Sequence, residues 1–145
     1  DYNGDGKADL AVLDQNVGRW YIYSYSTGEV LAWNFNWGWK GAAFIPGDFD
    51  GDGASDLAVY DQATANWYIY SIFKNQVLRW AQNWGFAGVT PVSADFDGDN
   101  ATDLVVYHES SGMWYILYYS GAVEYAGPWG GIGFKPVAGC NFDGQ

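Results

Sequence analysis

The sequence has few of the residues on which several classes of protein depend. One cysteine, Cys140, occurs in 145 residues, so the fold is not held together by an intrachain disulfide. The chain has six Lys and Arg residues and 17 Asp and Glu residues, which gives a net charge of −11. This balance argues against nucleic acid as a partner, because phosphate binding requires basic patches. No apolar run approaches the length of a membrane span.

The sequence also lacks a recognisable catalytic constellation. The single histidine, His108, is more typical of a polar surface turn than of a general base. No Ser or Cys has a base partner that recurs along the chain. We therefore expect that the chain is not an enzyme.

What the sequence does contain is an acidic loop with carboxylates at alternate positions, Asp48-Phe49-Asp50-Gly51-Asp52-Gly53-Ala54-Ser55-Asp56-Leu57. Like charges this close repel one another, so the folded loop needs a counter-charge. Calcium supplies one, because it binds about six to eight oxygen ligands from flexible, Asp-rich loops. Gly51 and Gly53 allow the sharp turns that direct these side chains to one centre.

The loop recurs with a fixed period. Copies begin at Asp1 and Asp95, each 47 positions from Asp48 (48 − 1 and 95 − 48), and a truncated copy begins at Asn141. Ordinary polar Asp-Gly turns are the alternative interpretation, but such turns do not require an acid at the ninth position three times. The sequence therefore predicts about three calcium ions per chain.

The predicted ligands are the side chains at loop positions one, three, five and nine, and the backbone carbonyl at position seven. They are Asp1, Asn3, Asp5, Lys7 and Asp9 in the first loop, Asp48, Asp50, Asp52, Ala54 and Asp56 in the second, and Asp95, Asp97, Asp99, Ala101 and Asp103 in the third. Asn3 carries no charge, so the first site is expected to be weaker. Asn100 replaces a glycine and is expected to adopt a left-handed backbone.

The loops are not EF-hands. Their twelfth positions are Val12, Val59 and Val106, where an EF-hand requires a bidentate Glu. Short β-type runs rather than helices flank them.

Each period contains four short aromatic and β-branched runs separated by turn residues, and no stretch has a helical period. In the run Trp67-Tyr68-Ile69-Tyr70, alternation places Trp and Ile on one face and the tyrosines on the other. A four-stranded antiparallel unit of 40 to 50 residues is typical of a β-propeller blade. We therefore predict an all-β fold of three blade repeats of about 47 residues.

The units resemble FG-GAP/VCBS repeats, a family related to the integrin α-subunit propeller. The resemblance rests on the Asp-Phe-Asp-Gly-Asp-Gly loop, the following Asp-Leu-Ala-Val-Tyr run, the Trp-Tyr-Ile run and the Trp-Gly link. The resemblance implies an extracellular, calcium-stabilised propeller, commonly of seven blades, with the loops between the first and second strands of each blade. Some members of the family are lectins, and others are adhesion modules or appendages of enzymes.

The expected repeats are residues 1–47, lacking a first strand, 48–94 and 95–140, with 141–145 starting a fourth loop. Three blades do not easily close a propeller, and a strand-like run at 134–141 overhangs the third repeat. Three arrangements stay open: a head-to-tail homodimer in which this run completes the neighbour's first blade, a piece of a larger propeller, and an open filament in which the head-to-tail contacts do not close. The first two are favoured equally.

The chain is rich in residues that bind sugars, with nine Trp and 12 Tyr. Trp20, Trp67 and Trp114 recur on strands and are expected in the core between blades.

The link residues Trp37, Trp84 and Trp129 are the candidate ligand-binding residues. Tyr23, Tyr25, Tyr70 and Arg79 are candidates for inter-blade surfaces. The predicted function is a multivalent, extracellular or cell-surface module that binds glycan or a protein ligand. The alternatives are a self-assembling structural subunit and a non-catalytic appendage of a secreted enzyme.

Overall fold

The computed structural model describes residues 1–137, which form strands β1 to β11 and no helix. Residues 138–145, which include Cys140 and the predicted fourth loop at 141–145, lie outside the described residues. The strands are β1 (Leu10–Asp14), β2 (Arg19–Tyr23), β3 (Val30–Asn36), β4 (Ala43–Gly47), β5 (Asp56–Asp61), β6 (Asn66–Ser71), β7 (Gln76–Asn83), β8 (Val89–Ala94), β9 (Asp103–His108), β10 (Met113–Leu117) and β11 (Val123–Ala126). The predicted all-β class is confirmed.

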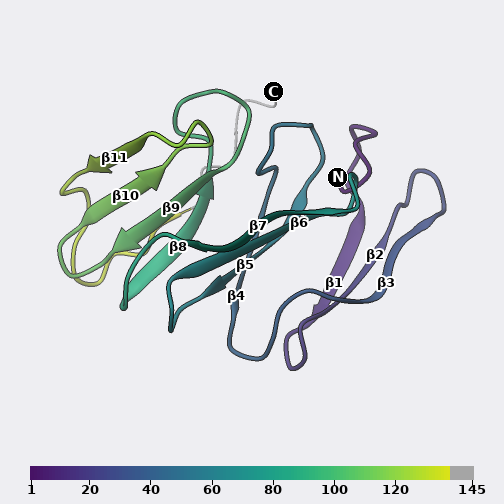
Figure 1. Cartoon of the computed structure of the whole chain (residues 1–145), viewed down its shortest axis with the longest axis horizontal. Helices are drawn as coiled ribbons and strands as arrows, with labels where there is room; N and C mark the ends of the chain where they lie inside the picture. Colours follow the sequence, from purple (N-terminus) through teal and green to yellow (C-terminus); the bar gives the residue numbers. More distant parts are fainter. Residues whose placement is uncertain (138–145) are drawn as a thin grey trace.

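The strands form three antiparallel sheets that lie side by side in chain order (Figure 1). The first sheet has the order β1-β2-β3, the second β4-β5-β6-β7 and the third β11-β10-β9-β8. Each sheet is a meander of hairpins, and none closes into a barrel, so the sheets are blade-like repeats. The strand before each of the second and third acidic loops pairs with the strand after it, β4 with β5 and β8 with β9.

Side chains on the two faces of a sheet contact different neighbouring sheets, as the alternation predicts. Trp67 and Ile69 of the second sheet pack toward Leu104 and Val106 of the third. Trp20 and Ile22 of the first sheet pack against Leu57 of the second. The tyrosines face the opposite way, since Tyr70 contacts Trp37 across the first junction at a centroid separation of 5.1 Å. The core is therefore a set of layers between successive sheets.

The Trp-Gly link needs its glycine for a physical reason. Gly85 has φ +124°, and a Cβ on it would lie 2.6 Å from Tyr60 Oη of the preceding sheet. Gly38 and Gly130 share the positive φ and a similar close approach to Phe44 and Tyr107. The link can therefore cross closely over an aromatic ring only where no side chain intervenes.

The first sheet has an open edge and an open face. Leu10 and Val12 of β1 are 60% and 66% exposed, whereas their equivalents Leu57 and Val59 are fully buried. The strand that would pair with β1, as β4 pairs with β5, is absent from residues 1–137.

The strand predicted at 134–141 is not a strand over residues 134–137, and its remainder lies outside the described residues. A single segment forms a strand only when another pairs with it, and the partner predicted for this one is the first blade of another copy. No helix in the described part of the chain is long and apolar enough to span a membrane.

Candidate functional site

The three acidic loops fold in the same way, around the carboxylate at their first position. Asp48 accepts hydrogen bonds from the backbone amides of Gly51 and Gly53, both at 2.8 Å. Asp1 accepts equivalent bonds from Gly4 and Gly6, and Asp95 from Gly98 and Asn100. The residues at the fourth and sixth positions all have positive φ, including Asn100 at 72°, so its predicted left-handed backbone is confirmed.

The carboxylate at the ninth position is buried in Asp56 and Asp103 and half-buried in Asp9. Both oxygens of Asp103 accept hydrogen bonds, since its Oδ1 accepts from the Tyr119 amide at 3.3 Å. Asp56 Oδ2 accepts a hydrogen bond of 2.8 Å from the Phe49 amide, and Asp103 and Asp9 bond the amides of Phe96 and Tyr2 in the same way. The other oxygen, Oδ1, has no partner in Asp56 or in Asp9, although it is buried in both. Burying a carboxylate oxygen without a partner is costly, so these atoms lie where a cation would be expected.

The predicted ligands converge to different degrees. Carboxylate oxygens of Asp48, Asp50 and Asp56 lie within 4.8 Å of one another, and so do those of Asp95, Asp97 and Asp99. Asp52 and Asp103 are not in these groups. Instead, Asp52 Oδ1 accepts from the Ala54 amide at 2.9 Å.

In the first loop, Asp1, Asp5 and Asp9 do not come together in this way. Asp5 accepts a hydrogen bond from the Ser26 hydroxyl, and Asn3 donates to Ser24 at 3.1 Å. Two of the predicted ligands are thus held by serines of the β2–β3 hairpin.

Successive loops are joined to one another by backbone hydrogen bonds. The Ser55 amide donates to the Asp1 carbonyl and the Thr102 amide to the Asp48 carbonyl, each at 2.5 Å. An ion held by one loop would therefore also fix the contact between two sheets.

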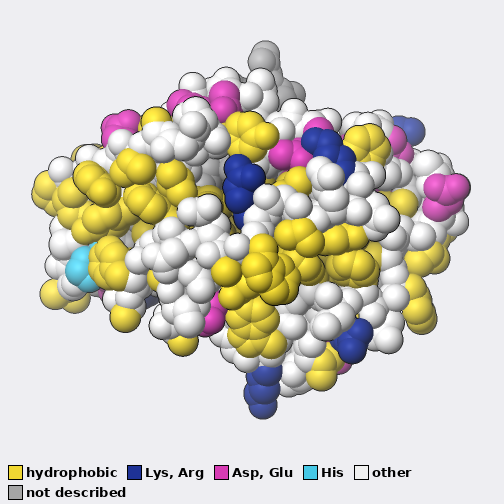
Figure 2. Space-filling view, viewed as in Figure 1, with side chains coloured by type: hydrophobic (Ala, Val, Ile, Leu, Met, Phe, Trp, Pro, Cys, Tyr) yellow, Lys and Arg dark blue, Asp and Glu magenta, His cyan; other side chains and the backbone are white. Residues whose placement is uncertain are grey.

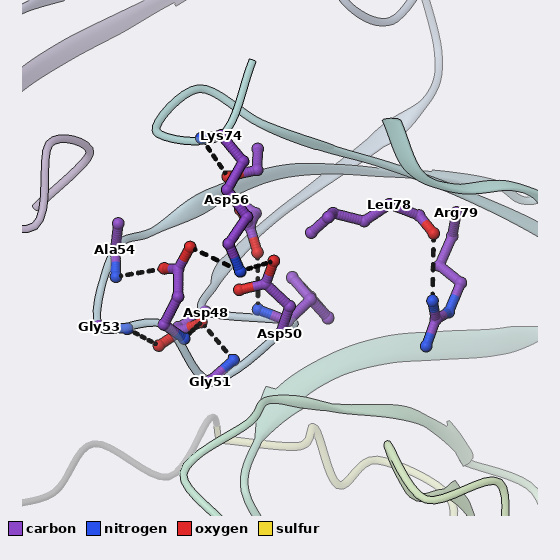
Figure 3. A network of polar contacts seen from close by, with 12 residues as sticks. Asp48, Asp50, Gly51, Gly53, Ala54, Asp56, Lys74, Leu78 and Arg79 are labelled. Atoms are coloured by element: carbon purple, nitrogen blue, oxygen red, sulfur yellow. Dashed lines mark hydrogen bonds and ion pairs between the residues drawn. The ribbon is translucent and has the colours of Figure 1, made fainter. Parts of the chain in front are cut away.

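A lysine lies at the second loop. Lys74, in the β6–β7 hairpin, places Nζ 2.7 Å from Asp50 Oδ2 and 3.0 Å from Asp52 Oδ2 (Figure 3). Its hydrogen bonds to these two acids raise the pKa of Lys74, so the ammonium stays charged. Its ammonium supplies part of the counter-charge that the acidic loop requires. The equivalent residues of the first and third repeats are Thr27 and Gly121. That difference is the only sequence signal that could have pointed to Lys74.

Burial raises the pKa of the ninth-position acids of the second and third loops. Loss of solvent, together with the charges of Asp50 and Asp48, raises the pKa of Asp56 from 3.8 to about 7. Loss of solvent and the charges of Asp97 and Asp95 raise the pKa of Asp103 to about 6. Without a bound metal ion, both carboxylates therefore keep a proton to a higher pH than an exposed aspartate does.

We expect the metal-free protein to lose stability as the pH rises from 5 to 7.5. Over this window the folded state binds more protons than the unfolded state, so the free energy of unfolding falls with increasing pH. The melting temperature in chelator should drop by about 5 °C across the window. Differential scanning fluorimetry in matched buffers measures this change in melting temperature. A melting temperature that rises from pH 5 to 7.5 would contradict the raised pKa values of the two buried acids.

A second candidate site recurs at the two junctions between sheets. At the first junction a pocket of about 330 Å³ is lined by Trp37, Trp39, Tyr68 and Trp80. At the second, a pocket of about 470 Å³ is lined by the equivalent residues Trp84, Phe86, Tyr115 and Tyr125. The same strand and link positions thus build the same aromatic hollow twice.

The geometry within the pockets also repeats. Tyr68 makes edge contacts with Trp39 and Trp80 at centroid separations of 5.4 and 5.2 Å. Tyr115 makes them with Phe86 and Tyr125 at 5.2 and 5.5 Å. Figure 2 shows broad apolar areas on one face of the molecule, separated by polar surface.

The predicted ligand residues occupy different places. Trp37 and Trp84 line the two pockets but are half-buried, and each indole donates to a backbone carbonyl of the next sheet at 3.3 Å. Trp129 is 81% exposed and lines a third hollow, of about 350 Å³, beside Trp114 and Phe134. Sequence reasoning missed the more exposed pocket residues Trp39, Trp80, Phe86 and Tyr125. Their shared positions in the repeats could have pointed to them.

The exposure of the remaining residues singled out in the sequence varies. Trp20 and Trp67 are buried, and Trp114 is half-buried. Tyr25 is 77% exposed. His108 contacts the hydroxyls of Ser111 and Ser110 at 2.7 and 2.8 Å within its own turn, a local arrangement that needs no catalytic explanation.

Comparison with known protein families supports the assignment of the repeat. A family model described as FG-GAP-like repeat matches residues 1–59, which span the first sheet, β4 and most of β5. No curated protein and no solved structure matches the chain. Residues 1–59 are thus an FG-GAP-like repeat segment, and with its blade-like sheets the chain is consistent with an FG-GAP/VCBS repeat family.

Proposed function

We propose that the chain is a calcium-stabilised binding module of β-propeller type that recognises carbohydrate. The observation that carries this proposal is the aromatic pocket repeated at both sheet junctions. A residue needed only for packing would be buried, but Trp80 is 70% and Tyr125 64% exposed. Exposed, rigid aromatic side chains around a hollow are typical of binding surfaces.

The pockets suit the chemistry of a sugar ring. The C–H face of a pyranose stacks on an aromatic ring, while its hydroxyls bond polar groups at the margin. Asn36 and Asn83, which precede the two link tryptophans, line the pocket margins. Because the pockets repeat, weak binding at each would combine into higher avidity for a branched or repeating glycan.

We propose calcium at the three loops because their donors are hard oxygen ligands. In the first two loops, buried oxygens of Asp9, Asp50 and Asp56 also lack partners. Bound calcium would supply the positive charge that lets the carboxylates coexist. The chain's own residues then hold the loops in register. The proposed setting is extracellular or on a cell surface, where free calcium is abundant.

Substitution of Trp80 tests the carbohydrate proposal. A panel of methyl glycosides and a glycan array identify the best neutral ligand, and isothermal titration measures its affinity. Trp80→Ala should weaken binding about fivefold, which corresponds to the loss of one aromatic contact.

Trp33→Ala is the matched control for this test. Trp33 occupies the equivalent position in the first sheet, is 75% exposed and makes the same edge contact, with Tyr21 at 5.2 Å. No preceding sheet faces it within residues 1–137, so it builds no such pocket. Equal losses in the two variants, or no glycan binding by the wild type, would contradict the proposal.

A self-assembling structural or adhesive subunit is the second candidate function. The open edge and apolar face of β1, with Leu10 and Val12 exposed, favour pairing with another strand, from a second copy or from further chain. Such assembly is compatible with glycan binding, and also with a non-catalytic role attached to a secreted enzyme.

A further inference from the structure

A separate cavity lies between the second and third sheets. It has a volume of about 430 Å³, and both polar and apolar side chains line it. Arg79 and Gln82 of β7 line it together with Thr102 of the third acidic loop, over an apolar floor that includes Ile69 and Leu104. Tyr119 supplies a half-exposed aromatic wall. A cavity of this size accommodates a monosaccharide.

The positive charge in this cavity has no acidic partner. Arg79 donates one hydrogen bond, of 3.1 Å, to the Leu78 carbonyl (Figure 3), and its guanidinium lies 5.6 Å from the Tyr119 ring centroid. Within residues 1–137, no Asp or Glu oxygen comes within 4.0 Å of it, whereas Lys74 and Lys135 each form ion pairs. Most of the five guanidinium donors are therefore left for a ligand.

The fold does not require an arginine at this position. In the three sheets, the residue paired with the central Ile of the Trp-Tyr-Ile strand is Ala32, Arg79 or Glu124. Ala32 is buried at 7% exposure, and Glu124 accepts a hydrogen bond of 2.5 Å from Tyr118. A small residue is thus sufficient for packing, and the arginine gives the second junction a charge that the first lacks.

We propose that this cavity binds an acidic saccharide, a hexuronic acid or a related carboxylated sugar. The planar guanidinium of Arg79 is suited to a bidentate contact with a carboxylate. Gln82 and Thr102 offer groups that can bond sugar hydroxyls, and Tyr119 offers an aromatic face. The inference rests on the proposed carbohydrate function, and it names a ligand class and a site distinct from the Trp80 pocket.

Calcium binding and saccharide binding should each increase the affinity for the other. The chain carries a net charge of −11, which repels an anion, and three bound calcium ions would reduce it to −5 (−11 + 6). Thr102 also lies between the predicted ligands Ala101 and Asp103. An ion at the third loop would hold this cavity wall in place, so saccharide binding should weaken in chelator.

The test compares methyl β-glucuronide with methyl β-glucoside, which differ only in the carboxylate, by isothermal titration in calcium. The glucuronide should bind at least about tenfold more tightly, as expected for a charge-assisted hydrogen-bond pair. Arg79→Gln should abolish this difference, and Arg79→Lys should restore part of it. Arg19→Gln, which changes the other arginine of the chain, should leave it intact. Thermal melts of each variant confirm that it folds.

Several results would overturn the proposal. They are equal affinity for the two glycosides, no binding of either, or a glucuronide preference that survives Arg79→Gln. Competition by acetate as strong as that by glucuronide would show a carboxylate site without sugar recognition. Loss of glucuronide binding in Trp80→Ala would place the ligand in the aromatic pocket. Because neutral glycans are tested separately with Trp80→Ala, the two carbohydrate proposals can fail independently.

Discussion

Saturating calcium is expected to raise the melting temperature of the protein by about 8 °C for each occupied loop. An ion present at about 100 times its dissociation constant stabilises the folded state by about 2.7 kcal/mol, and 1 kcal/mol corresponds to about 3 °C in a domain of this size. The physical cause is local. Buried oxygens such as Asp56 Oδ1 have no partner without the ion, and adjacent loops are joined through the backbone of Asp1 and Asp48.

Asp50→Asn separates this effect from general damage to the loop. Among the described contacts, Asp50 bonds only Lys74, and its other oxygen is buried without a partner. In chelator the variant should melt within about 2 °C of the wild type, since it loses one ion pair whose lysine side chain is 36% exposed. In calcium it should lose the gain from one site, about 8 °C.

Glu29→Gln removes an exposed acid outside the loops and is the charge-matched control, with no expected loss. Native mass spectrometry counts ions and chains in the same samples, with about three ions per chain expected. A similar loss for Asp50→Asn with and without calcium would exclude a metal role for the second loop. A dimer that dissociates on chelation would support the head-to-tail arrangement.

Much of the fold could be predicted because each repeat contains the same short-range sequence patterns. Alternation in Trp67-Tyr68-Ile69-Tyr70 assigns two faces, and both faces are covered because sheets pack on each side of β6. The Asp-Gly loops fix the turns through short-range hydrogen bonds, such as that of Gly51 to Asp48. Features of this kind depend on residues within about ten positions of one another, so the sequence specifies them directly.

The remaining features depend on contacts between repeats. The aromatic pocket at the first junction combines Trp39 from a link with Tyr68 and Trp80 from the following sheet, and their meeting depends on how the sheets pack. The open face of β1 is likewise a property of the array, because Leu10 has the same local sequence context as Leu57. Position within the array, which a repeat unit does not encode, determines whether each residue is covered.

Lys74 is a further case in which a side chain outside the motif changes the site. The motif predicts that the second loop, with its full set of aspartates, binds calcium well. The structure instead places an ammonium 2.7 Å from Asp50 and 3.0 Å from Asp52. A calcium ion that uses these oxygens must displace the ammonium, so its binding free energy is reduced by the two ion pairs.

Lys74→Thr, which introduces the residue found at the equivalent position of the first repeat, should therefore raise the calcium affinity of the second loop about tenfold. The estimate takes about 0.7 kcal/mol for each of two partly exposed ion pairs. Titration with calcium or terbium, in an Asp97→Asn background that weakens the third site, resolves the second loop. The same variant should lower the melting temperature in chelator, because the acids of the second loop then lack a counter-charge.

Lys40→Thr is the matched control, since Lys40 is an exposed lysine in the link after the first sheet and forms no ion pair within residues 1–137. The two variants remove the same net charge, so any difference between them arises from the position of the ammonium. Equal calcium affinities for Lys74→Thr and Lys40→Thr would mean that the lysine does not compete for the loop. A higher affinity in Lys74→Thr alone would identify Lys74 as an internal cation that sets the calcium concentration at which the second loop fills.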